Sequence, residues 1–95
     1  MGKYFVYILT NKTNKVLYVG VTGTLAQRIY QHKLKFVEGF SNRYGLNKLV
    51  YYEDYNNVWE AIHREKCIKR WKREWKNALV EKTDPYWKDL YYKII

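Results

Sequence analysis

The chain has 95 residues, enough for one compact domain and too few for two, so we expect a single domain over residues 1–95. Lys and Arg number 18 against 9 Asp and Glu, and the resulting formal net charge of +9 favours phosphate-rich partners. The one cysteine, Cys67, excludes an intrachain disulfide and a thiolate metal cluster. No apolar run reaches membrane-spanning length, so we expect no membrane partner and a cytoplasmic protein.

The N-terminal part predicts an antiparallel β-hairpin. Residues 4–10 are β-branched and aromatic with apolar residues on both faces, which is typical of a central strand covered on both sides. Residues 11–14 form a turn cluster, and residues 16–21 form a second strand-like run. A four-residue loop places Thr10 opposite Lys15, and Tyr7 then lies opposite Tyr18 on one face. The hairpin is therefore expected to bring two phenols side by side.

A helix is predicted directly after the second strand. A threonine at position 22 or 24 can cap it, and it runs to about residue 36 with Leu25, Ile29 and His32 on one face. Arg28 and His32 are one turn apart, so the guanidinium and the imidazole point the same way, close to the strand that carries Tyr18. This arrangement suits the binding of an anion.

A third strand and a second long helix follow. Residues 37–47, which include Arg43, read as a loop, and residues 48–53 read as a strand. A turn over residues 54–57 leads into a helix from residue 58 to about residue 72. The pattern predicts an α+β fold with a small three-stranded antiparallel sheet, made of the hairpin and the third strand, flanked by helices.

The C-terminal part is predicted to be helical with one break. Helix resumes at residue 74, breaks at residues 83–85, and continues as a short amphipathic segment with Asp84 as its cap and Pro85 in its first turn. This tail of residues 83–95 can close the domain's own core or dock on a partner.

Glu65 is the least expected residue of the second long helix, because it falls within an apolar stripe that contains Ala61 and Ile68. An unpaired buried carboxylate is costly, so Glu65 should be paired, bound to a cation, or left at the rim of a cleft. A salt bridge to Arg28 or Lys69 and a role as a metal ligand both remain open.

Four cations occupy the neighbouring arc of this helix: Lys66, Lys69, Arg70 and Arg73. Such a basic ridge either grips a nucleic-acid backbone or is a solvated helix face. Trp71 and Trp75, one turn apart on another side, are interpreted as packing residues in preference to base-stacking residues.

In order and spacing, these residues resemble the GIY-YIG nuclease family. The first signature stands here as Phe5-Val6-Tyr7, without its glycine, and the second as Tyr18-Val19-Gly20, with ten residues between the two tyrosines. Arg28 matches the family's helix arginine, Glu65 its metal-binding glutamate, and Asn77 the asparagine about twelve residues further on. The resemblance covers nearly the whole chain and is greatest to short stand-alone bacterial members, which are similar to the N-terminal nuclease domain of the nucleotide-excision-repair endonuclease.

The resemblance implies a metal-dependent endonuclease that hydrolyses phosphodiester bonds in DNA, in repair or processing. It implies that Glu65 holds one Mg²⁺ or Mn²⁺ ion, that a tyrosine, either Tyr18 or Tyr7, acts as general base, and that Gly20 and Asn77 support the site. A single carboxylate suits one ion that keeps most of its waters.

The chemistry of the residues agrees with these roles. Arg28 offers a permanently charged bidentate donor for a phosphate. His32 can relay a proton, or it can be a core histidine bonded to a backbone carbonyl. Arg43 and the basic ridge are the expected nucleic-acid contacts, and RNA remains possible. The alternative is a nucleic-acid-binding module whose nuclease activity is vestigial or very slow.

Overall fold

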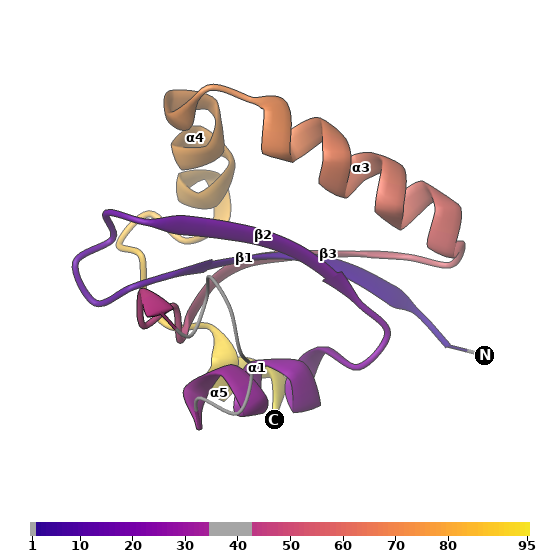
Figure 1. The fold of residues 1–95 in the computed structure, drawn as a ribbon, viewed down its shortest axis with the longest axis horizontal. Coiled ribbons are helices and arrows are strands. Elements are labelled where there is room, and N and C mark those ends of the chain that lie inside the picture. Colours follow the sequence, from indigo (N-terminus) through magenta and orange to yellow (C-terminus); the bar gives the residue numbers. More distant parts are fainter. Residues whose placement is uncertain (1, 35–42) are drawn as a thin grey trace.

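The computed structural model describes residues 2–34 and 43–95. A three-stranded antiparallel sheet with the strand order β2-β1-β3 lies between two layers of helices (Figure 1). The strands are β1 (Tyr4–Thr10), β2 (Leu17–Thr22) and β3 (Lys48–Tyr55). The helices are α1 (Leu25–Lys33), α3 (Val58–Arg70), α4 (Arg73–Thr83) and α5 (Tyr91–Ile94). The predicted α+β class, with a hairpin and a third strand flanked by helices, is confirmed.

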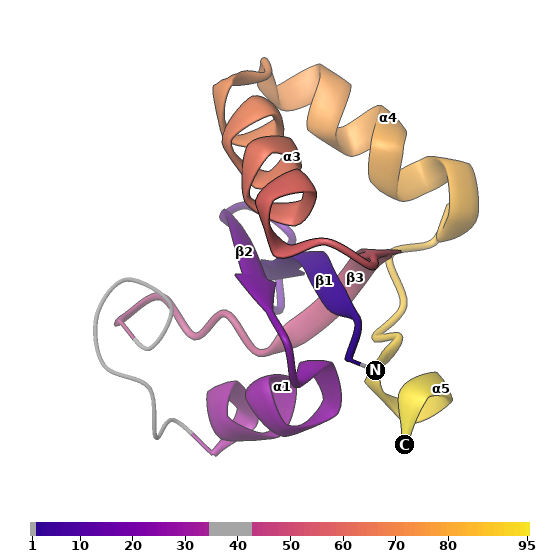
Figure 2. The ribbon, with the colours of Figure 1, turned by 90° about the vertical axis from the view of Figure 1, so that its right-hand side faces the viewer.

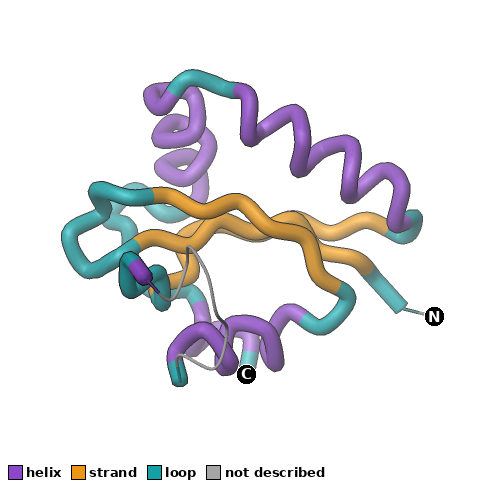
Figure 3. The backbone as a smooth tube through the Cα atoms, in the orientation of Figure 1, coloured by secondary structure: helices purple, strands orange, loops and turns teal. Residues whose placement is uncertain are grey.

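Helices cover both faces of the sheet. Helices α3 and α4 lie on one face and α1 and α5 on the other, with the strands between them (Figures 2 and 3). Alternation along β1 sends Val6 and Ile8 to the α3 side and Tyr7 and Leu9 to the α1 side. All four side chains are buried, as the apolar residues on both faces of this strand predicted.

The predicted hairpin register is wrong by two residues. Thr10 pairs with Leu17, and Tyr7 pairs with Gly20. The turn is longer than expected because the Asn11 side chain accepts hydrogen bonds from the Lys15 and Val16 amides, while the Thr10 hydroxyl donates to the Val16 carbonyl. Side chains alternate with a period of two, so this slip leaves Tyr7 and Tyr18 on the same face.

Other element boundaries also differ from the predictions. Strand β3 continues through Asp54 and Tyr55, which were predicted to turn, because Phe5 and Tyr4 of β1 pair with them. Helix α3 ends at Arg70, two residues early, since the next two residues have extended backbone before α4 begins. Helix α1 ends at residue 33, and its predicted extension to residue 36 lies outside the described residues.

The tail differs most from the prediction. Asp84 ends α4 and does not begin a new helix, and its carboxylate accepts a hydrogen bond from the Lys88 amide. Only Tyr91–Ile94 is helical, and Tyr91 packs in the core on the α1 side. The tail therefore closes the domain's own core. Among residues 2–34 and 43–95, no helix is long and apolar enough to span a membrane.

Candidate active site

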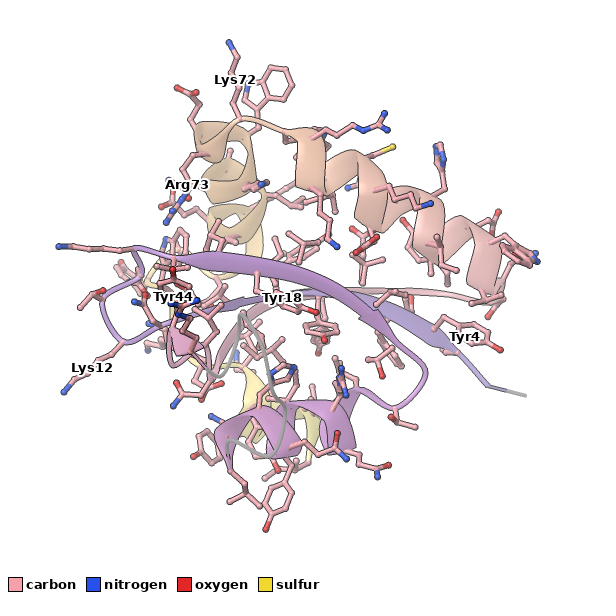
Figure 4. The ribbon with its side chains drawn as sticks, viewed as in Figure 1. Tyr4, Lys12, Tyr18, Tyr44, Lys72 and Arg73 are labelled. Atoms are coloured by element: carbon pink, nitrogen blue, oxygen red, sulfur yellow. The ribbon has the colours of Figure 1, made fainter. Side chains whose placement is uncertain are left out.

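Three rings gather on the α1 side of β1 and β2. The ring centroids of Tyr7 and Tyr18 are 6.2 Å apart, and the imidazole of His32 lies 6.3 Å from Tyr7 and 6.0 Å from Tyr18. Tyr18 points from β2 toward α1 in Figure 4. Strand alternation sets the two tyrosines, and the helical period of α1 places His32 beside Leu25 and Ile29 on its buried face. The structure thus brings three of the predicted site residues together.

Gly20 makes this ring cluster possible. A Cβ atom at this position would lie 2.6 Å from Cζ and Oη of Tyr7 and 2.9 Å from Cε2 of Tyr18. Both phenol rings therefore lie against the backbone of Gly20, at a distance that any side chain would prevent. The glycine of the second signature is required by packing of the two tyrosines.

The two tyrosines differ in their environments. Tyr7 is only 1% exposed, whereas Tyr18 is partly exposed on the edge strand β2. Burial raises the pKa of Tyr7 to about 12, the neighbouring Tyr18 adds to the increase, and the positive charge of Arg28 opposes it. Arg28, partly exposed on α1, therefore lies close enough to Tyr7 to act on its phenol.

His32 is buried and neutral. Its side chain is 4% exposed, and burial, followed by the charge of Arg28, lowers its pKa to about 4. Within the described part of the chain, Nε2 has no hydrogen-bond partner. This nitrogen is therefore available to a group that the protein itself does not supply.

Glu65 lies on the other side of the sheet. It is buried on α3, and its carboxylate forms an ion pair with Lys69, one helical turn further on, at 2.5 Å. The choice between Arg28 and Lys69 as its ion-pair partner is thus answered in favour of Lys69. Helices α3 and α1 cover opposite faces of the sheet, so Glu65 and the ring cluster do not lie on the same face (Figure 2).

Arg73 and Asn77 connect α4 to the hairpin. The Arg73 guanidinium donates to the carbonyls of Asn14 and Lys15, at 2.6 and 2.8 Å, and to Oδ1 of Asn77 at 2.8 Å. Figure 4 shows Arg73 at the same end of the molecule as Lys12, which lies in the hairpin turn. These contacts give both residues a structural role at the turn that fixes the hairpin register.

The other predicted basic contacts are on the surface. Lys66, Arg70 and Arg43 are exposed, and Lys69 is exposed although it is paired with Glu65. All nine acidic residues of the chain occur after residue 34, so the hairpin and α1 contain none. The first 34 residues, which carry the ring cluster, therefore have basic side chains but no acidic ones.

The two tryptophans have separate environments. Trp71 packs against the core on the α3 side with the Arg64 guanidinium 5.1 Å from its ring centroid. Trp75 is 54% exposed, touches Trp71 edge-on, and has the Lys72 ammonium 6.0 Å from its ring. The packing interpretation describes Trp71 well, while most of Trp75 faces solvent.

One polar cluster was not predicted from the sequence. The Glu53 carboxylate accepts hydrogen bonds from the phenols of Tyr51 and Tyr55 and from Arg64 of α3. Burial alone would raise the pKa of Glu53, but these donors lower it below its usual value. Tyr51, Glu53 and Tyr55 alternate along β3 and therefore share one face, and this spacing was the sequence signal that could have revealed the cluster. This cluster ties α3 to the sheet.

Cleft size does not identify the site. A cleft of about 490 Å³ is lined by Tyr55 of β3 and by residues of α3, among them Trp59, His63 and Cys67. It includes none of the residues of the ring cluster. The chemistry of the side chains therefore locates the candidate site better than concavity does.

The domain is small and basic, and two phenols, an arginine and a neutral histidine gather on the α1 face of its sheet, where their donors and positive charge suit an anionic ligand. Comparison with known families agrees, since the family described as the GIY-YIG catalytic domain matches residues 3–78. The chain belongs to the GIY-YIG family, which is a family of nucleases.

Two relatives support this assignment. The UPF0213 protein CPE1444 of Clostridium perfringens is 38% identical over 76 residues, which are 80% of this chain and 81% of that protein. The solution NMR structure of the UPF0213 protein BH0048 from Bacillus halodurans superposes with a TM-score of 0.58 at 26% identity and covers 92% of each chain. The predicted resemblance to short stand-alone members is confirmed.

Proposed function

We propose that this protein is an endonuclease that hydrolyses phosphodiester bonds in DNA, in DNA repair or processing in the cytoplasm. The observation that carries the proposal is the gathering of Tyr7, Tyr18 and His32, with both phenols against Gly20 and Arg28 beside them. Hydrolysis of a phosphodiester needs a base for the attacking water and positive charge at the phosphoryl oxygens. These side chains offer both.

Tyr18 is the better candidate for the general base. It is partly exposed at the edge of the sheet, where water can reach its oxygen, whereas Tyr7 is buried. A free phenol has a pKa of about 10, so a nearby cation must stabilise the phenolate for catalysis near neutral pH. Tyr7, with a pKa of about 12, remains protonated and orients Tyr18 and Arg28.

Arg28 and His32 complete the site on the α1 side. The guanidinium of Arg28 binds two phosphoryl oxygens and stabilises the charge that develops on them. His32 is neutral at physiological pH because its pKa is about 4. Its unpartnered Nε2 can therefore accept a hydrogen bond from the phenol of Tyr18 or from water, and so orient the base.

Glu65 fits a lightly held divalent cation. Within the described residues no three His, Cys, Asp or Glu side chains converge, so a fully protein-ligated metal centre does not fit. One largely buried carboxylate does fit Mg²⁺ or Mn²⁺ held mainly by water, with Lys69 moving away from Glu65. Such an ion would supply positive charge at the phosphate and lower the pKa of a bound water.

DNA is proposed to lie along the exposed cations of α3. Lys66, Lys69 and Arg70 form a ridge beside Glu65, and Arg43 extends the positive surface. Contacts of this kind bind phosphates without reading bases, so we expect little sequence selectivity.

Cleavage assays with matched variants test the proposal. The purified protein is incubated with single-stranded, duplex and branched DNA and with RNA, in Mg²⁺, Mn²⁺ or EDTA. Cutting should need the cation and fall by at least ~100-fold in Arg28→Ala, Tyr18→Phe and Glu65→Gln, while binding persists. Glu60→Gln, an exposed glutamate on the same helix, should cut normally. Undiminished cutting by Glu65→Gln would contradict the metal assignment.

A second candidate is a nucleic-acid-binding module with vestigial or very slow cleavage. The ion pair that Lys69 makes with Glu65 favours it, because a cation must displace this ammonium. In that case the protein binds DNA or RNA in a salt-dependent way and cuts neither with Mg²⁺ nor with Mn²⁺.

A further inference from the structure

Asp89, in the segment between α4 and α5, connects three separate elements. One carboxylate oxygen accepts hydrogen bonds from the backbone amide of Leu49 in β3, at 3.1 Å, and from that of Tyr91 in α5, at 3.0 Å. The other oxygen forms an ion pair with Lys33 in the last turn of α1. A single side chain therefore fixes α1, β3 and α5 relative to one another.

Lys33 is enclosed at its end of this ion pair. Its ammonium also donates to the Asn47 carbonyl at 2.9 Å and lies 5.1 and 5.4 Å from the ring centroids of Tyr91 and Tyr92. The side chains of Lys33 and Asp89 are only 20% and 19% exposed. A pair this enclosed, with further hydrogen bonds to the Asn47 carbonyl and to two backbone amides, holds a defined geometry.

The ion pair lies next to the candidate site along the chain. Lys33 directly follows His32 and is little more than one turn beyond Arg28 on the same helix. Helix α1 has only nine residues, and its N-cap residue, Thr24, makes no side-chain capping hydrogen bond. The polar contacts of Lys33 therefore fix the last turn of the helix that carries the phosphate-binding arginine.

We propose that Asp89 is a positioning residue of the nuclease site. Through Lys33 it sets the orientation of α1, and so the placement of Arg28 against a phosphate and of His32 against Tyr18. This role rests on the proposed nuclease function. Asp89 lies outside residues 3–78, the part of the chain that matches the family, so it is an addition to the family's site residues.

Two substitutions of Asp89 separate its contacts. Asp89→Ala removes all of them, whereas Asp89→Asn keeps an oxygen for the two amides and loses the charge that pairs with Lys33. Small displacements of catalytic groups can reduce rates by ~100-fold, so Asp89→Ala should lower kcat by at least ~10-fold with KM changed less than ~2-fold. Asp89→Asn should be intermediate. Asp54→Asn, which breaks the exposed ion pair with Lys3, should retain the wild-type kcat.

The imidazole of His32 gives a readout that needs no cleavage. By NMR, His32 of the wild type should keep a constant shift from about pH 7.5 to about pH 5, because its pKa is about 4. It should titrate within this range in Asp89→Ala, because a displaced α1 exposes the ring. Lys33→Met breaks the same ion pair and replaces Asp89→Ala if that variant does not fold.

The combined outcomes decide the role of Asp89. A lower melting temperature with unchanged kcat and an unchanged His32 titration in Asp89→Ala or Lys33→Met would overturn it. If the wild type cuts no substrate, the proposed function fails, and the His32 titration alone then decides whether Asp89 positions α1.

Discussion

At the scale of single residues, Gly20 has the most restricted environment of the site. In Gly20→Ala the new methyl group would overlap the rings of Tyr7 and Tyr18. We expect the variant to lose ~1–3 kcal/mol in free energy of unfolding, as other overpacked sites do, and to lose cleavage because both phenols move. Chemical denaturation and cleavage assays measure the two effects.

Gly23→Ala is the matched control, since its added Cβ would only meet the Tyr4 ring at an ordinary distance of 3.7 Å. An equal loss of stability in the two variants would contradict the packing role of Gly20.

His32 makes a pH-dependent contribution to stability. Its pKa is about 4 in the folded protein and about 6.5 in the unfolded chain, so the unfolded state takes up the proton first as the pH falls. This contribution is fully present above pH ~6.5 and is lost as the pH falls toward ~4. Between these values the wild type should lose ~3 kcal/mol more of its free energy of unfolding than His32→Phe does.

Denaturant titrations at several pH values measure this difference. His63→Phe removes the other histidine, which is exposed, and should retain the wild-type pH dependence. Identical pH profiles for the wild type and His32→Phe would contradict the burial of a neutral imidazole.

At the scale of elements, the hairpin turn depends on α4. Arg73→Lys loses the forked hydrogen bonds to the Asn14 and Lys15 carbonyls. We expect a loss of ~1–2 kcal/mol in stability and faster amide exchange at the turn, because this contact holds the loop that fixes the register. Arg70→Lys changes an exposed arginine at the end of α3 and should alter neither the stability nor the amide exchange at the turn. Equal effects of the two substitutions would show that Arg73 is only a surface cation.

The element types were predictable, because periodicity in the sequence reports which faces are buried. The register of the hairpin was not predictable, because it depends on the side chains of Asn11 and Thr10, whose hydrogen bonds extend the turn. The non-helical path of the tail was also not predictable, because it is stabilised by hydrogen bonds that Asp84 and Asp89 accept from backbone amides. Side-chain bonds to the backbone have no periodic signature.

The candidate site was largely predictable for a different reason. Tyr7, Tyr18, Arg28 and His32 lie on short, regular elements, where spacing alone sets the shared face. Glu65 was correctly recognised as buried, but its ion pair with Lys69 depends on a rotamer that spacing does not specify.

At the scale of the whole molecule, the distribution of charge indicates where a nucleic acid would lie. The hairpin and α1 contain no acidic residue, whereas Glu53 and Asp54 lie on β3, at the opposite edge of the sheet from β2. A polyanion is therefore attracted to the β2 edge and repelled from the β3 edge.

The salt dependence of DNA binding tests this orientation. Each phosphate contact contributes ~0.9 to the slope of log K against log salt for duplex DNA, so Lys66→Ala and Arg70→Ala should each reduce the slope by about that amount. Lys88→Ala removes an exposed lysine from the tail, next to Asp89, which is bonded to β3, and should leave the slope unchanged. If the slope falls equally in all three variants, the affinity for DNA depends on the total charge of the protein, and DNA does not bind preferentially at the β2 edge.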